Sequence, residues 1–154
     1  MYDGFQRARR EHDDISPNEA GAMRLWDARM MVYWSGAALA LVADVRLRRL
    51  SGGRETLDSV LGKLQACCLP SVRIWRGREF FKKLDELSPY KIFTGLYDMY
   101  ADSPGLPDIN PDFRALGITL DNGKVILQDN APDAGLREAI MHTDEVVARR
   151  RGKG

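Results

Sequence analysis

Apolar residues are concentrated in one long stretch of the chain, residues 30–53. Within it Ala37, Leu41 and Val45 recur at helical spacing, which predicts a single long helix over residues 30–51. The first half of this stretch is apolar on nearly every side, so we expect a central helix that neighbouring helices cover on most sides. Arginines in its last turns oppose the negative end of the helix dipole, and the glycines that follow favour a helix end.

Shorter helices are predicted on either side of this central one. Ser16 and Glu19 frame a proline in the pattern of a capping box, which predicts a helix over residues 17–29. Residues 1–12 resemble the end of a further helix. The remaining apolar patterns predict a helix from residue 55 or 56 to 69, helices over 77–87 and 92–100, a short turn over 111–116, and a last helix that opens at Pro132 and runs through Leu136, Ile140 and Met141.

One segment, residues 118–127, has the pattern of two short strands. Asn122 and Gly123 separate the strands, and this pair favours a tight hairpin turn because both residues accept positive φ. The expected fold class is therefore mainly α, a bundle of about five to seven helices around the central helix 30–51, with one small β-hairpin.

The length of 154 residues suits one domain, which we place at residues 1–148. The basic run 149–154 is expected to be a disordered tail, and the net charge of +1 gives no reason to expect a nucleic-acid partner. Residues 1–14 are highly charged and do not resemble a secretory signal. The apolar run 30–43 is short for a membrane span, so a cytoplasmic location is the default expectation.

Few residues in the chain suit a metal or redox site. Cys67 and Cys68 are adjacent, whereas disulfides usually join well-separated Cα atoms, so we expect two reduced thiols at a helix end. Zinc hydrolases carry an HExxH motif with a further ligand beyond it. The two histidines, His12 and His142, lie outside any such motif, so no metal site and no cofactor are predicted in this chain.

An ordered set of short motifs resembles the helical part of the M61 glycyl aminopeptidase family, which are zinc metallopeptidases of the gluzincin group. The motifs are Tyr33, Gly36-Ala37, Asp44-Val45-Arg46-Leu47-Arg48, Ser51-Gly52-Gly53 and Leu57-Asp58-Ser59-Val60-Leu61, and weaker similarity continues to about Leu120. The resemblance implies that residues 1–148 correspond to the C-terminal subdomain of the M61 catalytic domain.

The same resemblance implies a role for one side chain. The M61 family also resembles the M1 aminopeptidases around this tyrosine. In the M1 enzymes, a tyrosine three residues before the glycine stabilises the oxyanion of the tetrahedral intermediate, and Tyr33 stands at that position. Two features depart from the family. Its HExxH helix and the glutamate beyond it are expected upstream of this region, and Ser35 stands where many relatives carry lysine.

Three functional hypotheses follow from these motifs. The first is a non-catalytic helical domain that resembles the M61 subdomain and is inactive alone. The second is a fragment that belongs to an active M61 metallopeptidase when it is joined to an upstream zinc-binding lobe, with a peptide as substrate. The third is a small interaction module that uses the arginine-rich tail or an exposed groove.

Two physical expectations accompany these hypotheses. If residues 1–30 pack on an upstream lobe, the chain by itself exposes apolar area and self-associates. If Gly36 permits close contact between helices, a bulky residue there harms folding more than a substitution at Ser35.

Overall fold

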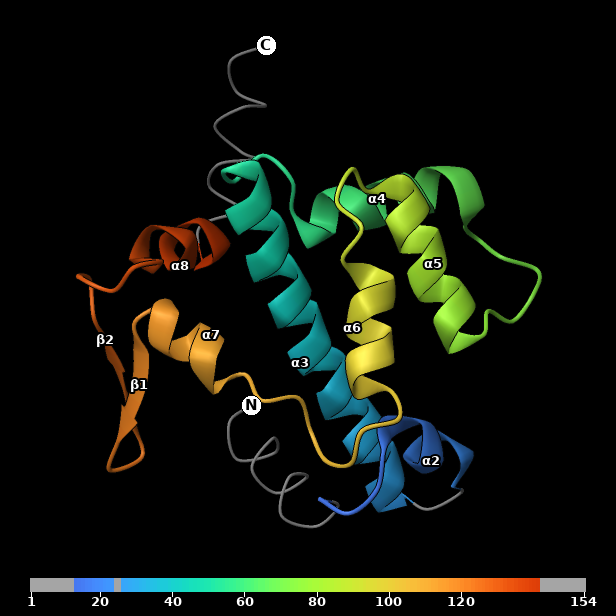
Figure 1. The fold of residues 1–154 in the computed structure, drawn as a ribbon, viewed down its shortest axis with the longest axis horizontal. Coiled ribbons are helices and arrows are strands. Elements are labelled where there is room, and N and C mark those ends of the chain that lie inside the picture. Colours follow the sequence, from blue (N-terminus) through green and yellow to red (C-terminus); the bar gives the residue numbers. More distant parts are fainter. Residues whose placement is uncertain (1–12, 24–25, 142–154) are drawn as a thin grey trace. The chain divides into compact units, whose positions relative to one another are not determined.

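The structure is a computed structural model that describes residues 13–23 and 26–141 (Figure 1). Contacts along the chain gather into two compact units, residues 1–108 and residues 109–154, and each unit is described by itself. Helices dominate the described residues and one antiparallel hairpin accompanies them, so the predicted mainly α fold class is confirmed.

Some predictions made from the sequence are not tested by the described residues. The helical segment expected at residues 1–12 and the basic tail at 149–154 lie outside the described residues. The expectation of one domain over residues 1–148 stays a prediction, because each of the two compact units is defined only by its own contacts.

The first unit is a group of helices around one long helix. Its elements are α2 (Pro17–Ala22), α3 (Trp26–Ser51), α4 (Leu57–Cys68), α5 (Gly77–Leu87) and α6 (Phe93–Tyr100). Helix α3 contacts α2, α4 and α6, while α5 contacts α4 and α6. The central position predicted for the long helix therefore holds within this unit.

The helix predicted over residues 17–29 is wrong in its extent, because the chain forms two helices there. The capping box at Ser16 is confirmed, but Met23 has extended backbone with ψ of 145° and ends α2. The break allows α2 to pack back on α3, and it buries Ala20 against Met31. Apolar spacing continued across the break and gave no sign of this turn.

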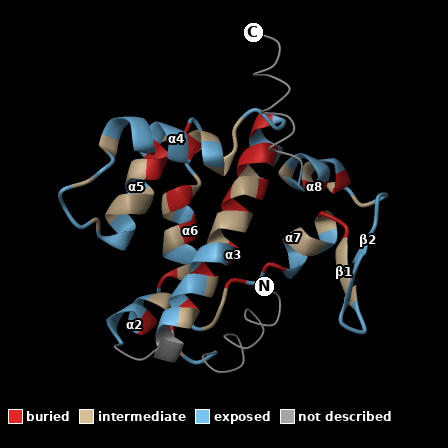
Figure 2. Cartoon of the chain, turned by 180° about the vertical axis from the view of Figure 1, so that it is seen from behind, coloured by how far each residue is buried: buried red, intermediate tan, exposed pale blue. Residues whose placement is uncertain are grey.

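The burial of α3 differs from the expectation that its first half is covered on most sides. One stripe is buried at helical spacing, and it comprises Met31, Ser35, Ala38, Val42 and Val45. The opposite side of the first half faces solvent, with Val32 40% exposed and Tyr33 62% exposed (Figure 2). Only one face of this first half is covered, and an apolar sequence does not reveal which face that is.

Helix α3 also meets the length and composition of a membrane span. The expectation against a span considered only residues 30–43, whereas the helical stretch from Arg29 to Ser51 is long and apolar enough to cross a bilayer. A core helix of a soluble protein satisfies the same criterion, so the length of α3 assigns no location.

Two aspartates connect consecutive helices of the first unit. Asp44 on α3 accepts a hydrogen bond from the backbone N–H of Leu57, the first residue of α4, at 2.8 Å. Asp85 on α5 accepts hydrogen bonds from the N–H groups of Phe93 and Thr94, the first residues of α6, both at 2.8 Å. Each carboxylate thus satisfies N–H groups that have no partner inside their own helix and complements the helix dipole.

The second unit contains α7 (Asn110–Ala115), β1 (Ile118–Asp121), β2 (Lys124–Leu127) and α8 (Ala134–Met141). The predicted hairpin is confirmed, and Ile118 pairs with Leu127 at its open end. Asn122 and Gly123 have φ of 48° and 78°, as a two-residue hairpin turn with both positions at positive φ requires.

A buried arginine organises the second unit. Arg137 on α8 is 4% exposed, and its Nη1 donates hydrogen bonds to the carbonyls of Leu116 and Gln128, both at 3.1 Å. Gly117 lies beside the Arg137 guanidinium and has φ of 72°. A Cβ added at Gly117 would lie 2.2 Å from the carbonyl oxygen of Gln128, so a larger residue does not fit there. The burial of Arg137 was not predicted from the sequence.

Replacing Asp85 with alanine tests the link between α5 and α6. We expect Asp85→Ala to lower the free energy of unfolding by about 2 kcal/mol, because two N–H groups lose a charged acceptor. Equilibrium urea unfolding followed by circular dichroism measures this loss. The matched control is Glu86→Ala on the same helix, which removes an exposed ion pair with Lys83 and should cost less than about 1 kcal/mol. Equal losses in the two variants would contradict the role given to Asp85.

Substitutions at Ser35 and Gly36 test which face of α3 is packed. The structure reverses the expectation for this pair, because Ser35 is 2% exposed whereas a Cβ added at Gly36 meets no atom within 4 Å. We expect Ser35→Leu to destabilise the fold by about 1–3 kcal/mol through overpacking. Gly36→Ala should stabilise it by about 0.5–1 kcal/mol, since alanine is the better helix former. Thermal unfolding of both variants decides the order, and a larger loss at Gly36 would refute this account.

Candidate functional site

Tyr33, the residue singled out by sequence, lies on the exposed side of α3. Its ring packs edge-on against Trp34, with 5.0 Å between ring centroids, and 62% of the residue remains exposed. Tyr33 therefore does not fill the core. It is also absent from the walls of the pocket described below.

Metal ligands do not converge within the described part of the chain. There, no three side chains among His, Cys, Asp and Glu come close enough to hold one ion. His12 and His142 lie outside the described residues. The prediction that this chain holds no metal or cofactor of its own stays a prediction.

An open pocket of about 540 Å³ lies in the first unit, beside the end of α4. Three consecutive segments line it, namely the last turn of α4, the loop that follows, and one side of α5. Their lining residues are Cys67, Cys68, Pro70, Ser71, Val72, Arg73, Trp75, Glu79, Lys82, Lys83 and Glu86. The pocket is thus a local feature, formed where the chain leaves one helix and enters the next.

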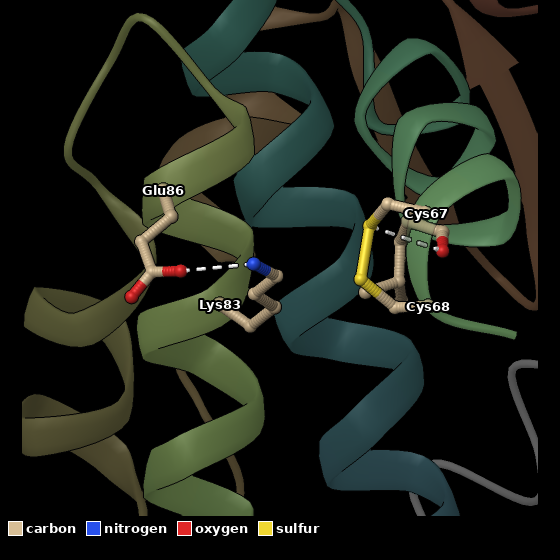
Figure 3. The surroundings of a disulfide bond; sticks show 5 residues. Cys67, Cys68, Lys83 and Glu86 are labelled. Carbon is tan, nitrogen blue, oxygen red and sulfur yellow. Dashed lines mark hydrogen bonds and ion pairs between the residues drawn. A yellow bond between two sulfur atoms is a disulfide. The ribbon is translucent and has the colours of Figure 1, made fainter. Parts of the chain in front are cut away.

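Cys67 and Cys68 form a disulfide at one side of this pocket (Figure 3). The expectation of two reduced thiols is wrong for this structure. It relied on the usual wide spacing of bridged Cα atoms, whereas these Cα atoms lie 3.7 Å apart and the two side chains still meet. The predicted location at a helix end is correct, because α4 ends at Cys68 and Leu69 has extended backbone.

The loop after α4 is held by contacts to Arg73. The Arg73 guanidinium lies over the Trp75 ring, 4.4 Å from its centroid, and its Nη1 is 2.6 Å from Oε1 of Glu79 on α5. Ser71 adds a local turn, since its Oγ accepts a hydrogen bond from the Arg73 N–H at 3.2 Å. These contacts place a cation–π pair and an ion pair along the pocket wall.

Positive charge exceeds negative charge around the pocket. Arg73 is paired with Glu79, and Lys83 is paired with Glu86 at 3.0 Å beside the disulfide (Figure 3). No carboxylate in residues 13–23 or 26–141 pairs with the remaining cation, Lys82. The lining therefore carries one more positive charge than negative charge and favours an anionic ligand.

Two parts of this pocket were predicted from the sequence, namely the cysteine pair at a helix end and the helix over residues 77–87. The segment between them was predicted only as the end of a helix. The available signal was Arg73 two residues before Trp75, because a guanidinium can pack over an indole ring.

Comparisons of this chain with models of known protein families, with curated proteins and with solved structures found no match. The resemblance to the M61 family, and the oxyanion-stabilising role that it implies for Tyr33, therefore stay predictions.

Proposed function

We propose that this chain is a non-catalytic helical domain that resembles the C-terminal subdomain of M61 zinc aminopeptidases and acts by contact with another protein surface. On this proposal the chain holds no zinc and hydrolyses no peptide by itself. The sequence resemblance supports the family assignment in this proposal. The helical domain would be a scaffold, and the zinc site would lie on another protein surface.

The observation that carries the proposal is the exposure of Tyr33 on an apolar part of α3. Tyr33 is 62% exposed and Val32 is 40% exposed, and the next turn adds the exposed small residues Gly36 and Ala37. A phenol in this position can reach a group on a second protein surface, whereas a core tyrosine could not. This supports a role at an interface.

The chemistry of a phenol explains why such a domain would be inactive alone. A phenol O–H can stabilise an oxyanion only where a metal-bound water or another nucleophile generates one. In the M61 family that nucleophile comes from the zinc site, and neither His12 nor His142 stands in the required motif. Tyr33 would therefore contribute only beside a lobe that carries the zinc.

Zinc content and peptidase activity test the proposal directly. We expect purified protein, after incubation with zinc and desalting, to retain less than stoichiometric metal by mass spectrometry and to leave glycyl-peptide substrates intact. Stoichiometric zinc together with turnover would overturn the proposal. In that case Tyr33→Phe, which removes the donor and keeps the ring, would show whether the turnover depends on the phenol.

The second candidate is a part of an active M61-type peptidase, with the exposed side of α3 joined to an upstream zinc-binding lobe. The apolar exposure of Val32 and Tyr33 favours it, because such a surface gains free energy when another surface covers it. An upstream coding sequence with an HExxH motif would support this candidate, and its absence from the genomic sequence would remove it.

Self-association in the absence of that lobe is the measurable consequence. We expect light scattering to show a mass that rises with protein concentration, since copies of the chain would cover the exposed side of α3 for one another. The double variant Val32→Ser, Tyr33→Ser should stay monomeric. The control is Val125→Ser, which removes a 61% exposed apolar residue on β2 and should leave the association unchanged. A monomeric mass at high protein concentration would contradict the proposal that the exposed side of α3 is an interface.

A further inference from the structure

The disulfide between Cys67 and Cys68 belongs to residues at the surface of the first unit. Cys67 is exposed and Cys68 is partly exposed, and both residues line the pocket at the end of α4. Thiol–disulfide exchange requires a thiolate to approach one sulfur of the bond. The pocket provides room for a small molecule beside these sulfurs, in contrast to a disulfide enclosed in a core.

The charges of the pocket select among small thiols. Lys82 and Lys83 lie on the α5 side, and Glu86 neutralises Lys83 only. A thiol whose carboxylates give it a net negative charge would be attracted to this wall, while a thiol with a net positive charge would be repelled.

Trp75 also lines the pocket, where the Arg73 guanidinium lies over its ring. Its indole Nε1 is buried and has no hydrogen-bond partner within the described part of the chain. Because this nitrogen has almost no accessible surface, a ligand in the open pocket would not contact it, and the lysine wall is what distinguishes one thiol from another.

We propose that this pocket is a site of thiol–disulfide exchange with low-molecular-weight thiols that carry carboxylates. A thiolate attacks one cysteine sulfur, forms a mixed disulfide with it, and releases the other cysteine as a thiolate. A second small thiolate then attacks the sulfur that the first small thiol contributed to the mixed disulfide. This step releases the remaining cysteine as a thiolate. Two electrons pass from two small thiols to the protein, which becomes a dithiol while the small thiols become a disulfide.

One contact becomes more favourable in the reduced protein. The Cys67 sulfur lies 3.6 Å from the carbonyl oxygen of Leu64, one turn earlier on α4. A disulfide sulfur has no proton to donate, whereas a thiol is a weak donor. Reduction would therefore allow Cys67 to donate a weak hydrogen bond to the Leu64 carbonyl.

The test uses the full chain, oxidised and folded, with glutathione as the probe thiol. Mass spectrometry after acid quenching follows the mixed disulfide and the gain of two hydrogens on the protein, while circular dichroism shows that the fold is kept. We expect reduction of the folded protein, and Lys82→Gln should slow it about 2- to 5-fold at low ionic strength. Added salt should reduce the difference between Lys82→Gln and the unsubstituted protein.

Two controls separate this pocket from general charge and general reactivity. Lys124→Gln removes a lysine of β2 that lies outside the pocket and should leave the glutathione rate unchanged. Cysteamine, a small thiol with an ammonium group, should react faster with Lys82→Gln than with the unsubstituted protein. The proposal is wrong if the bond resists glutathione until the chain unfolds, or if Lys82→Gln and Lys124→Gln react at the same rate. These results do not depend on zinc or peptidase activity, so they are independent of the proposed function.

Discussion

Helix α4 is held at its start by a carboxylate from another helix. Asp44 of α3 accepts the N–H of Leu57 with one oxygen, while its other oxygen lies 2.7 Å from Nε of Arg48, one turn further along α3. Both partners of this ion pair are largely buried, with side-chain exposures of 15% and 7%, so water screens the pair only weakly. Because Arg48 fixes the orientation of the carboxylate, the direction in which α4 leaves α3 is set by a charged contact as well as by apolar packing.

The pocket depends on this arrangement. Its walls are the last turn of α4, the loop after it and one side of α5, so the start of α4 and the position of α5 together determine how the cysteine pair faces the lysines. Asp85 acts on α6 as Asp44 acts on α4. Its carboxylate accepts hydrogen bonds from the first N–H groups of α6 and so holds the start of α6 against α5. Two acidic residues that would ordinarily be assigned to the surface thus position the helices that form the pocket.

The long helix α3 serves two roles on its two sides. The stripe from Met31 to Val45 is the part of α3 that enters the core of the first unit. The other side of its first half carries Tyr33 and leaves apolar surface in contact with solvent. The exposed part of α3 and the pocket beside α4 lie on different elements, so contact with a partner and thiol exchange are separate proposals for separate surfaces.

The sequence by itself determined the ends of several elements, because those signals act within one turn. The capping box at Ser16, the helix over residues 77–87 and the turn at Asn122 and Gly123 were predicted from neighbouring residues, and the structure confirms each of them. Tyr33 was named as a candidate from short motifs, but its exposure could not be predicted from them.

Only the tertiary structure decided which side of each element is covered and which side chains meet. The break after α2, the burial of Ser35 rather than Gly36, the buried Arg137 and the pocket around Cys67 and Cys68 all depend on contacts between separate elements. The physical reason is that capping and turn formation involve groups a few residues apart, whereas burial depends on which distant surfaces the folded chain brings together.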